Sequence, residues 1–139
     1  MAAYNKYENF VEDLAVGVHN LNTGVLKVAL SNTAPDAAAD EVLVDFAEIS
    51  AGNGYTAGGT DTQNAVSRTG GTVSVTGVDV VFTAAGGSIG PFRYVGLYND
   101  TPTSPADPLI GWWDYGSSIT LLTTETFTVD FGSSMFTLA

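Results

Sequence analysis

The hydrophobic positions follow a helical period only near the N-terminus. In "NKYENFVEDLAVG" they fall at i, i+3, i+4 and i+7, the spacing of one apolar stripe on a helix: Tyr7, Phe10, Val11 and Leu14. Asn5 can serve as the N-cap, Glu8 follows it at the spacing of a capping box, and Gly17 offers a stop. We therefore predict a helical N-terminal arm over residues 1–20, whose apolar stripe docks on a sheet or on a neighbouring subunit.

The pattern of residues 21–139 is mainly that of short strands. In "VLKVALSN", alternation places Leu26, Val28 and Leu30 on one face of a strand. From residue 65 onwards, short apolar runs recur at intervals of about ten residues, separated by Gly-rich or Pro-rich breaks. This half of the chain lacks the crossover helices that a parallel sheet needs. The pattern predicts a mainly β fold, an antiparallel β-sandwich or jelly-roll-like domain with one short N-terminal helix.

The segment "DEVLVDFAEISAGNGY" fits two patterns. Val42, Phe46 and Ile49 have helical spacing, with Gly52 as a candidate C-cap. Val42, Val44 and Phe46 also alternate as they would in a strand. We favour a short helix.

Two tryptophans stand side by side in "PLIGWWDYG", which follows the strand-like run "FRYVGLYN" after a Pro-rich loop. Successive side chains of a strand point to opposite faces, so the two rings enter different surroundings. Alternation places on one face Leu109, Gly111, Trp113 and Tyr115, and on the other Ile110, Trp112 and Asp114. In the preceding strand it aligns Phe92, Tyr94, Gly96 and Tyr98, opposite Arg93, Val95 and Leu97. We predict that Trp113 enters the core, whereas Trp112 faces a partner together with Arg93 and Asp114.

Composition narrows the classes of function. The 139 residues fit one domain, and with no cysteine neither a disulfide nor a thiolate metal site can form. Four basic residues stand against fifteen acidic ones, a net charge of −11, which argues against nucleic acid as a direct partner. The N-terminus lacks the features of a signal peptide, and no apolar run approaches the roughly 20 residues of a membrane span, so we expect no membrane partner.

The chain is also poor in charge of either sign. Charged residues make up 14% of it, against about 25% in ordinary soluble domains. Such a surface is expected where other subunits cover much of it, and it is equally usual in Thr-rich and Gly-rich β proteins.

No constellation in the sequence predicts catalysis, a cofactor or a metal ion. "GNGYTAGG" is not placed between a strand and a helix as a nucleotide-binding loop is, and reads better as a turn-rich loop held by Tyr55. The acidic cluster of residues 36–45 lacks the spacing of a calcium loop, so we expect a solvated edge. His19 is the sole histidine and is expected to be structural or exposed. We therefore predict a non-enzymatic protein, with no catalytic, cofactor-binding or metal-binding residues.

Four segments together carry a resemblance to small structural proteins of tailed bacteriophage virions: "YNKYENFVEDLAVGVHNLNTGVLKVALSNTAP", "AEISAGNGYTAGG", "FRYVGLYNDT…DPLIGWWDYG" and "TFTVDFGSSMFTLA". The resemblance spans nearly the whole chain and implies a single virion structural domain over residues 1–139, made in the host cytoplasm. Family members are variously described as virion, head-decoration or tail-associated proteins.

Within the virion, we expect a capsid decoration or cement protein on the capsid exterior, which bridges subunits of the major capsid protein. We also expect a homo-oligomer, most simply a trimer. The alternative is a tail-tip or fibre module that binds a host surface glycan through a stacked aromatic ring. The residues predicted to form the partner interface are Tyr7, Phe10, Leu14, Arg93, Trp112 and Asp114.

Overall fold

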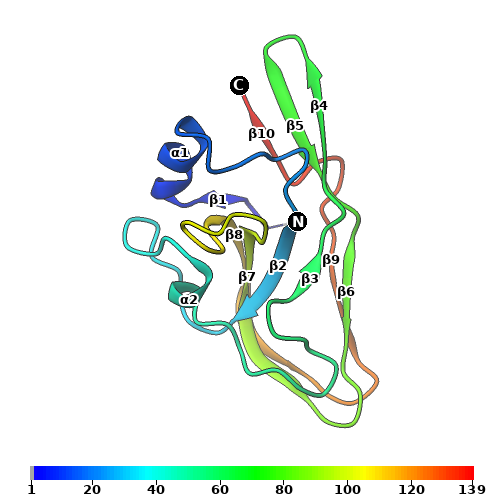
Figure 1. Cartoon of the computed structure of the whole chain (residues 1–139). Helices are drawn as coiled ribbons and strands as arrows, with labels where there is room; N and C mark the ends of the chain where they lie inside the picture. Colours follow the sequence, from blue (N-terminus) through cyan, green and yellow to red (C-terminus); the bar gives the residue numbers. More distant parts are fainter. Residues whose placement is uncertain (1) are drawn as a thin grey trace.

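The computed structural model describes residues 2–139. The alternating runs form strands, which lie in two layers of antiparallel sheet (Figure 1). The first layer is a five-stranded sheet in the order β1 (Asn5–Lys6), β8 (Leu109–Leu121), β7 (Ile89–Asn99), β2 (Leu26–Ser31) and β3 (Thr60–Asp61). Its centre is the long β7–β8 hairpin, which contains the two adjacent tryptophans. The prediction of a mainly β, antiparallel, sandwich-like fold is confirmed.

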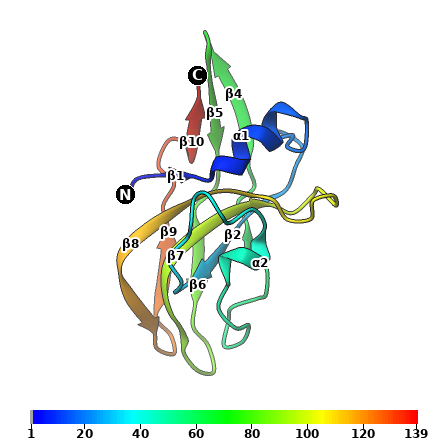
Figure 2. The same cartoon turned by 90° about the vertical axis from the view of Figure 1, so that its left-hand side faces the viewer.

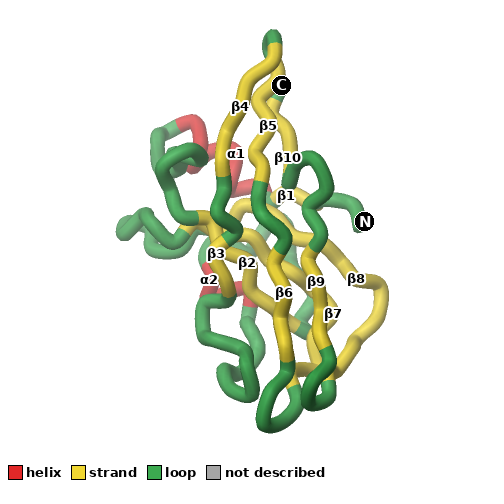
Figure 3. Tube along the Cα trace, turned by 90° about the vertical axis from the view of Figure 1, so that its right-hand side faces the viewer, coloured by secondary structure: helices red, strands yellow, loops and turns green. Residues whose placement is uncertain are grey.

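The second layer consists of two smaller sheets. One has the order β10 (Phe136–Leu138), β5 (Thr72–Thr76) and β4 (Ala65–Thr69), and the other pairs β6 (Val80–Thr83) with β9 (Thr126–Val129). The β4–β5 hairpin projects beyond the rest of the chain (Figure 2 and Figure 3). Strand β4 is the outer strand of its sheet.

Two apolar clusters lie on opposite faces of the five-stranded sheet. The main core fills the space between the layers and contains the alternating residues Leu26, Val28 and Leu30 of β2, all fully buried. The smaller cluster lies on the outer face of the sheet, where helix α2 (Leu43–Phe46) places Phe46. The five-stranded sheet is therefore covered on both faces in its middle part.

Helix α1 (Glu8–Ala15) begins later than the sequence predicts. Asn5 pairs with Trp112 as part of strand β1, so it does not cap the helix, and Tyr7 occupies the N-cap position without a side-chain cap hydrogen bond. The predicted capping box is thus wrong, because strand pairing with β8 holds the backbone of Asn5 extended. The helix itself is confirmed and ends just before Gly17, whose φ is +86°.

The ambiguous segment forms the short helix α2, as favoured. It ends at Ala47, which has a left-handed φ of 54°, rather than at Gly52. The Asp45 carboxylate accepts hydrogen bonds from the backbone N–H groups of Glu41 and Val42 at 3.0 and 3.1 Å, which holds the start of the helix.

The β7–β8 pairing has three register shifts, and two of them change which side chains face the core. Tyr98 is opposite Leu109 and Leu97 is opposite Gly111, so Ile110 is an extra residue on β8. Leu109 consequently joins the outer cluster and Ile110 the main core, the reverse of the predicted faces. A second register shift puts Phe92 in the main core, away from its predicted companions Tyr94, Gly96 and Tyr98.

Candidate interaction surface

Trp113 lies in the main core, as predicted. Its side chain is 5% exposed, and its ring centroid is 5.7 Å from that of Tyr4 and 5.8 Å from that of Phe131. Val95 is its cross-strand partner and belongs to the same core. The indole N–H has no hydrogen-bond partner among the described residues, so packing alone holds this ring in place.

Trp112 lies on the opposite face of the same strand and is half-buried. Its ring packs on that of Tyr7, with centroids 4.7 Å apart, at the edge of the outer cluster. The predicted separation of the two rings is confirmed. The companions of Trp112 differ from the prediction, because Val95 and Leu97 face the core and Gly96 is the residue opposite Trp112.

Arg93 and Asp114 form a bidentate ion pair beside Trp112. The Nε of Arg93 donates to Oδ1 of Asp114 at 2.8 Å, and a terminal guanidinium nitrogen donates to Oδ2 at 3.1 Å. The guanidinium carbon also lies 5.4 Å from the centroid of the Tyr94 ring. The hydrogen bond from Arg93 holds the pKa of the Asp114 carboxyl below its usual value. Both side chains keep more than a third of their surface exposed, so the pair remains open to a partner.

The N-terminal helix does not present the stripe that the sequence predicts. Tyr7 and Phe10 are 0% and 1% exposed, because Tyr7 packs in the outer cluster and Phe10 in the main core. Neither side chain is available to a partner, which corrects their assignment to the interface. Leu14 is half-buried against the main core, whereas Val11 and Val16 are exposed.

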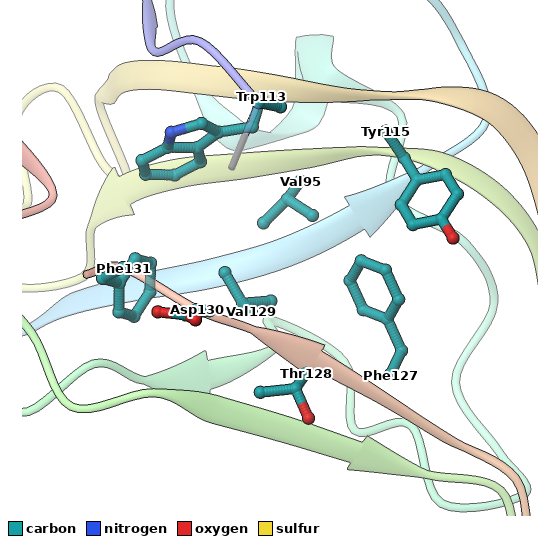
Figure 4. Close-up of a pocket in the computed structure, with 9 residues that line it drawn as sticks. Val95, Trp113, Tyr115, Phe127, Thr128, Val129, Asp130 and Phe131 are labelled. Carbon is teal, nitrogen blue, oxygen red and sulfur yellow. The ribbon is translucent and has the colours of Figure 1, made fainter.

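An apolar groove runs along one open side of the sandwich, between β8 and β9 (Figure 4). Its volume is about 270 Å³. Four aromatic rings and two polar side chains contribute to its lining: Trp113, Tyr115, Phe127, Phe131, Thr128 and Asp130. Tyr115 is 53% exposed. This groove was not predicted from the sequence, although the alternation of "TFTVDF" could have predicted an apolar face on β9.

Tyr55 fastens the glycine-rich loop, as predicted. Its hydroxyl donates to Glu48 at 2.6 Å and accepts the backbone N–H of Leu30 at 3.1 Å. The same carboxylate accepts the backbone N–H of Gly58, whose carbonyl accepts the hydroxyl of Tyr98 at 2.6 Å. Burial, followed by the bond to Glu48, raises the pKa of Tyr55. These contacts describe a structural loop.

The other titratable groups of interest are structural by their surroundings. His19 is buried, its Nδ1 lies 3.2 Å from the Asn99 amide nitrogen, and burial lowers its pKa to about 4. Lys27 and Asp100 form an ion pair at 2.9 Å. Burial and then the neighbouring Asp100 raise the pKa of Asp107. Within residues 2–139, no three His, Cys, Asp or Glu side chains are placed to hold a metal ion.

The architecture places the chain in the class of mainly β, antiparallel sandwich proteins. Among the helices of residues 2–139, none has the length and apolar character needed to cross a membrane. Comparison with known proteins finds no matching family model, no similar curated protein and no similar solved structure.

Proposed function

We propose that this chain is a non-enzymatic structural protein of a tailed bacteriophage virion, a capsid decoration protein that associates with copies of itself and bridges subunits of the major capsid protein. The observation that carries the proposal is the surface around Trp112. There a half-buried tryptophan and an accessible ion pair, Arg93 with Asp114, lie on the sheet face opposite the main core. Aromatic and arginine side chains of this kind are the usual anchors of protein interfaces.

Exposed valines also favour an interface on the side of the sheet that carries Trp112. Val11 of α1, Val16 at the C-cap of α1 and Val44 of α2 are 51%, 69% and 86% exposed. Both helices lie on the side of the five-stranded sheet away from the second layer (Figure 1). We call the surface formed by these three valines with Trp112 the helical face. Exposed apolar side chains on the same side of the sheet as an aromatic anchor favour a protein partner.

The acidic charge of the segment that contains both helices bears on the chemistry of the partner. Eight of the fifteen acidic residues of the chain lie within residues 1–48, which contain both helices. A capsid surface that carries basic side chains would complement it, and such complementarity favours docking in one orientation.

The test is occupancy on particles assembled without the protein. Purified wild-type protein is expected to bind at a copy number near that of the major capsid protein. Trp112→Ala is expected to lower its affinity about 30-fold, since truncation of an aromatic anchor costs about 2 kcal/mol. Val81→Ala serves as the control, because Val81 is an exposed apolar residue (55%) on the second layer, away from the helical face. Equal occupancy of both variants would remove the helical face as the docking surface.

A second candidate is the tail-tip or fibre module that binds a host glycan. The groove favours this candidate because the exposed ring of Tyr115 lies in the same lining as Thr128 and Asp130. An aromatic ring with polar side chains beside it is a common arrangement in ligand sites. Scarcity of the protein in purified virions, together with glycan binding lost in Tyr115→Ala, would support this candidate over the first.

A further inference from the structure

The groove between β8 and β9 is bordered by two strand edges without a strand partner. Strand β9 pairs only with β6, and β1 covers β8 only at Gly111 and Trp112, so among the described residues nothing continues either sheet across the gap. Unpaired backbone N–H and C=O groups next to apolar rings can accept an added strand. The groove therefore has the shape and chemistry of a strand-binding site.

The projecting β4–β5 hairpin is the element best suited to enter such a site. Strand β4 is an outer strand of five residues paired in regular register with β5, without a proline or a bulge to block its free edge. Arg68 is exposed and Val73 is half-buried, and they are opposite each other in the hairpin. The tip of the hairpin extends beyond the rest of the chain (Figure 3), whereas Val66 and Val73 pack against the main core.

Charge distinguishes the hairpin from the rest of the chain. Residues 62–78 contain no acidic residue and include Arg68, in a chain of net charge −11. The other cations include Lys27 and Arg93, both held in ion pairs. The groove, by contrast, has the exposed carboxylate of Asp130 in its lining. Two copies of this acidic chain repel each other on average, but hairpin and groove are complementary in charge.

We propose that the β4–β5 hairpin of one copy docks in the groove of the next copy, where β4 adds to the free edge of β9. Arg68, which is exposed, would reach Asp130 of the groove, whereas Val66 on the same side of β4 stays packed against the main core of its own copy. The contact joins two different surfaces, so it is head-to-tail and closes into a ring when the rotation permits. This inference rests on the self-association included in the proposed function.

Sedimentation of the purified full-length chain, in the absence of capsids, measures this contact alone. Wild type is expected to associate with rising concentration. Arg68→Glu, which damages the hairpin, and Tyr115→Arg, which damages the groove, are each expected to raise the dissociation constant at least about tenfold. Lys6→Glu makes the same charge change at an exposed residue outside the groove lining and is expected to associate like wild type. Capsid occupancy is measured separately. Failure of the hairpin–groove contact is therefore distinguished from failure of the proposed docking on the capsid.

Mixing the two defective variants gives the decisive result. Arg68→Glu retains an intact groove and Tyr115→Arg an intact hairpin, so the mixture is expected to form a 1:1 complex although each variant alone stays monomeric. If Tyr115→Arg associates like wild type, the contact is hairpin to hairpin and the proposal is wrong. Wild type that is monomeric at every concentration, or a mixture without a complex, also overturns it. If Tyr115→Arg loses its folded circular dichroism spectrum, Thr128→Arg, at an exposed position of the same lining, replaces it in the mixture.

Discussion

Alanine substitution of each tryptophan tests which face of β8 carries the core. Trp113 is 5% exposed and packs between Tyr4 and Phe131. Removal of a buried aromatic side chain costs about 3–5 kcal/mol of unfolding free energy, depending on how the vacated space is filled. Because this ring borders the groove, solvent can enter the space, and because its N–H is unpaired, no hydrogen bond is lost. We therefore expect Trp113→Ala to cost about 3–4 kcal/mol.

The Trp112 side chain contributes less to the unfolding free energy than that of Trp113. It is half-buried and has one close aromatic neighbour, Tyr7, at 4.7 Å. Full burial of a large apolar side chain contributes about 3 kcal/mol, and an aromatic pair adds about 1 kcal/mol, so a half-buried ring contributes about 2 kcal/mol. The predicted loss for Trp112→Ala is thus about half that for Trp113→Ala.

Urea unfolding of wild type and the two variants measures both losses of unfolding free energy. Each loss is read from the shift of the unfolding midpoint, with the dependence of the free energy on urea concentration unchanged. Thermal unfolding provides a second measure, at about 3 °C per kcal/mol for a chain of this length. The phenylalanine variants at both positions keep an aromatic ring and serve as controls with smaller losses. A larger loss for Trp112→Ala than for Trp113→Ala would refute the argument, because it would mean that the register of β8 is shifted by one residue and its faces exchanged.

Two further predictions concern buried polar groups. Tyr55→Phe removes the acceptor of the Leu30 N–H and is expected to lower the unfolding free energy by about 1–3 kcal/mol, measured by urea unfolding. His19 has a folded pKa of about 4 against 6.5 when unfolded, so below pH 6.5 the unfolded chain binds the proton more readily and stability falls as the pH drops towards 4. Between pH 7 and pH 4, wild type is expected to lose about 3 kcal/mol more than His19→Gln does; equal losses in the two proteins would contradict the pKa assignment.

Local patterns predicted most of the architecture, because much of it follows from side-chain alternation. The short runs after residue 65 formed antiparallel strands, and the apolar stripe near the N-terminus formed α1. Trp113 is buried in the core, and Tyr55 anchors its loop through the bond to Glu48. These are features that a residue and its immediate neighbours determine.

The errors arose where distant segments decide the conformation. Asn5 has a good capping sequence, but pairing with a strand more than one hundred residues away holds it extended. Tyr7 and Phe10 form the expected stripe, yet the stripe is divided between two clusters. The local pattern predicts neither the extended backbone of Asn5 nor the division of the stripe, because both depend on where the N-terminal segment packs against β8.

The bulges of β8 connect these errors to the candidate groove. Between Phe92 opposite Ile119 and Tyr94 opposite Asp114, strand β7 has one intervening residue and β8 has four, Tyr115–Ser118, with Gly116 at a φ of 104°. Bulges of this kind bend a strand, redirect a side chain and interrupt pairing. On β8, the bulge follows directly after the short pairing with β1, and it places Tyr115 half-exposed at the groove beside the free edge of β9. The segment where alternation fails therefore also borders the groove through Tyr115, and the positive φ of Gly116 lets β8 bend there.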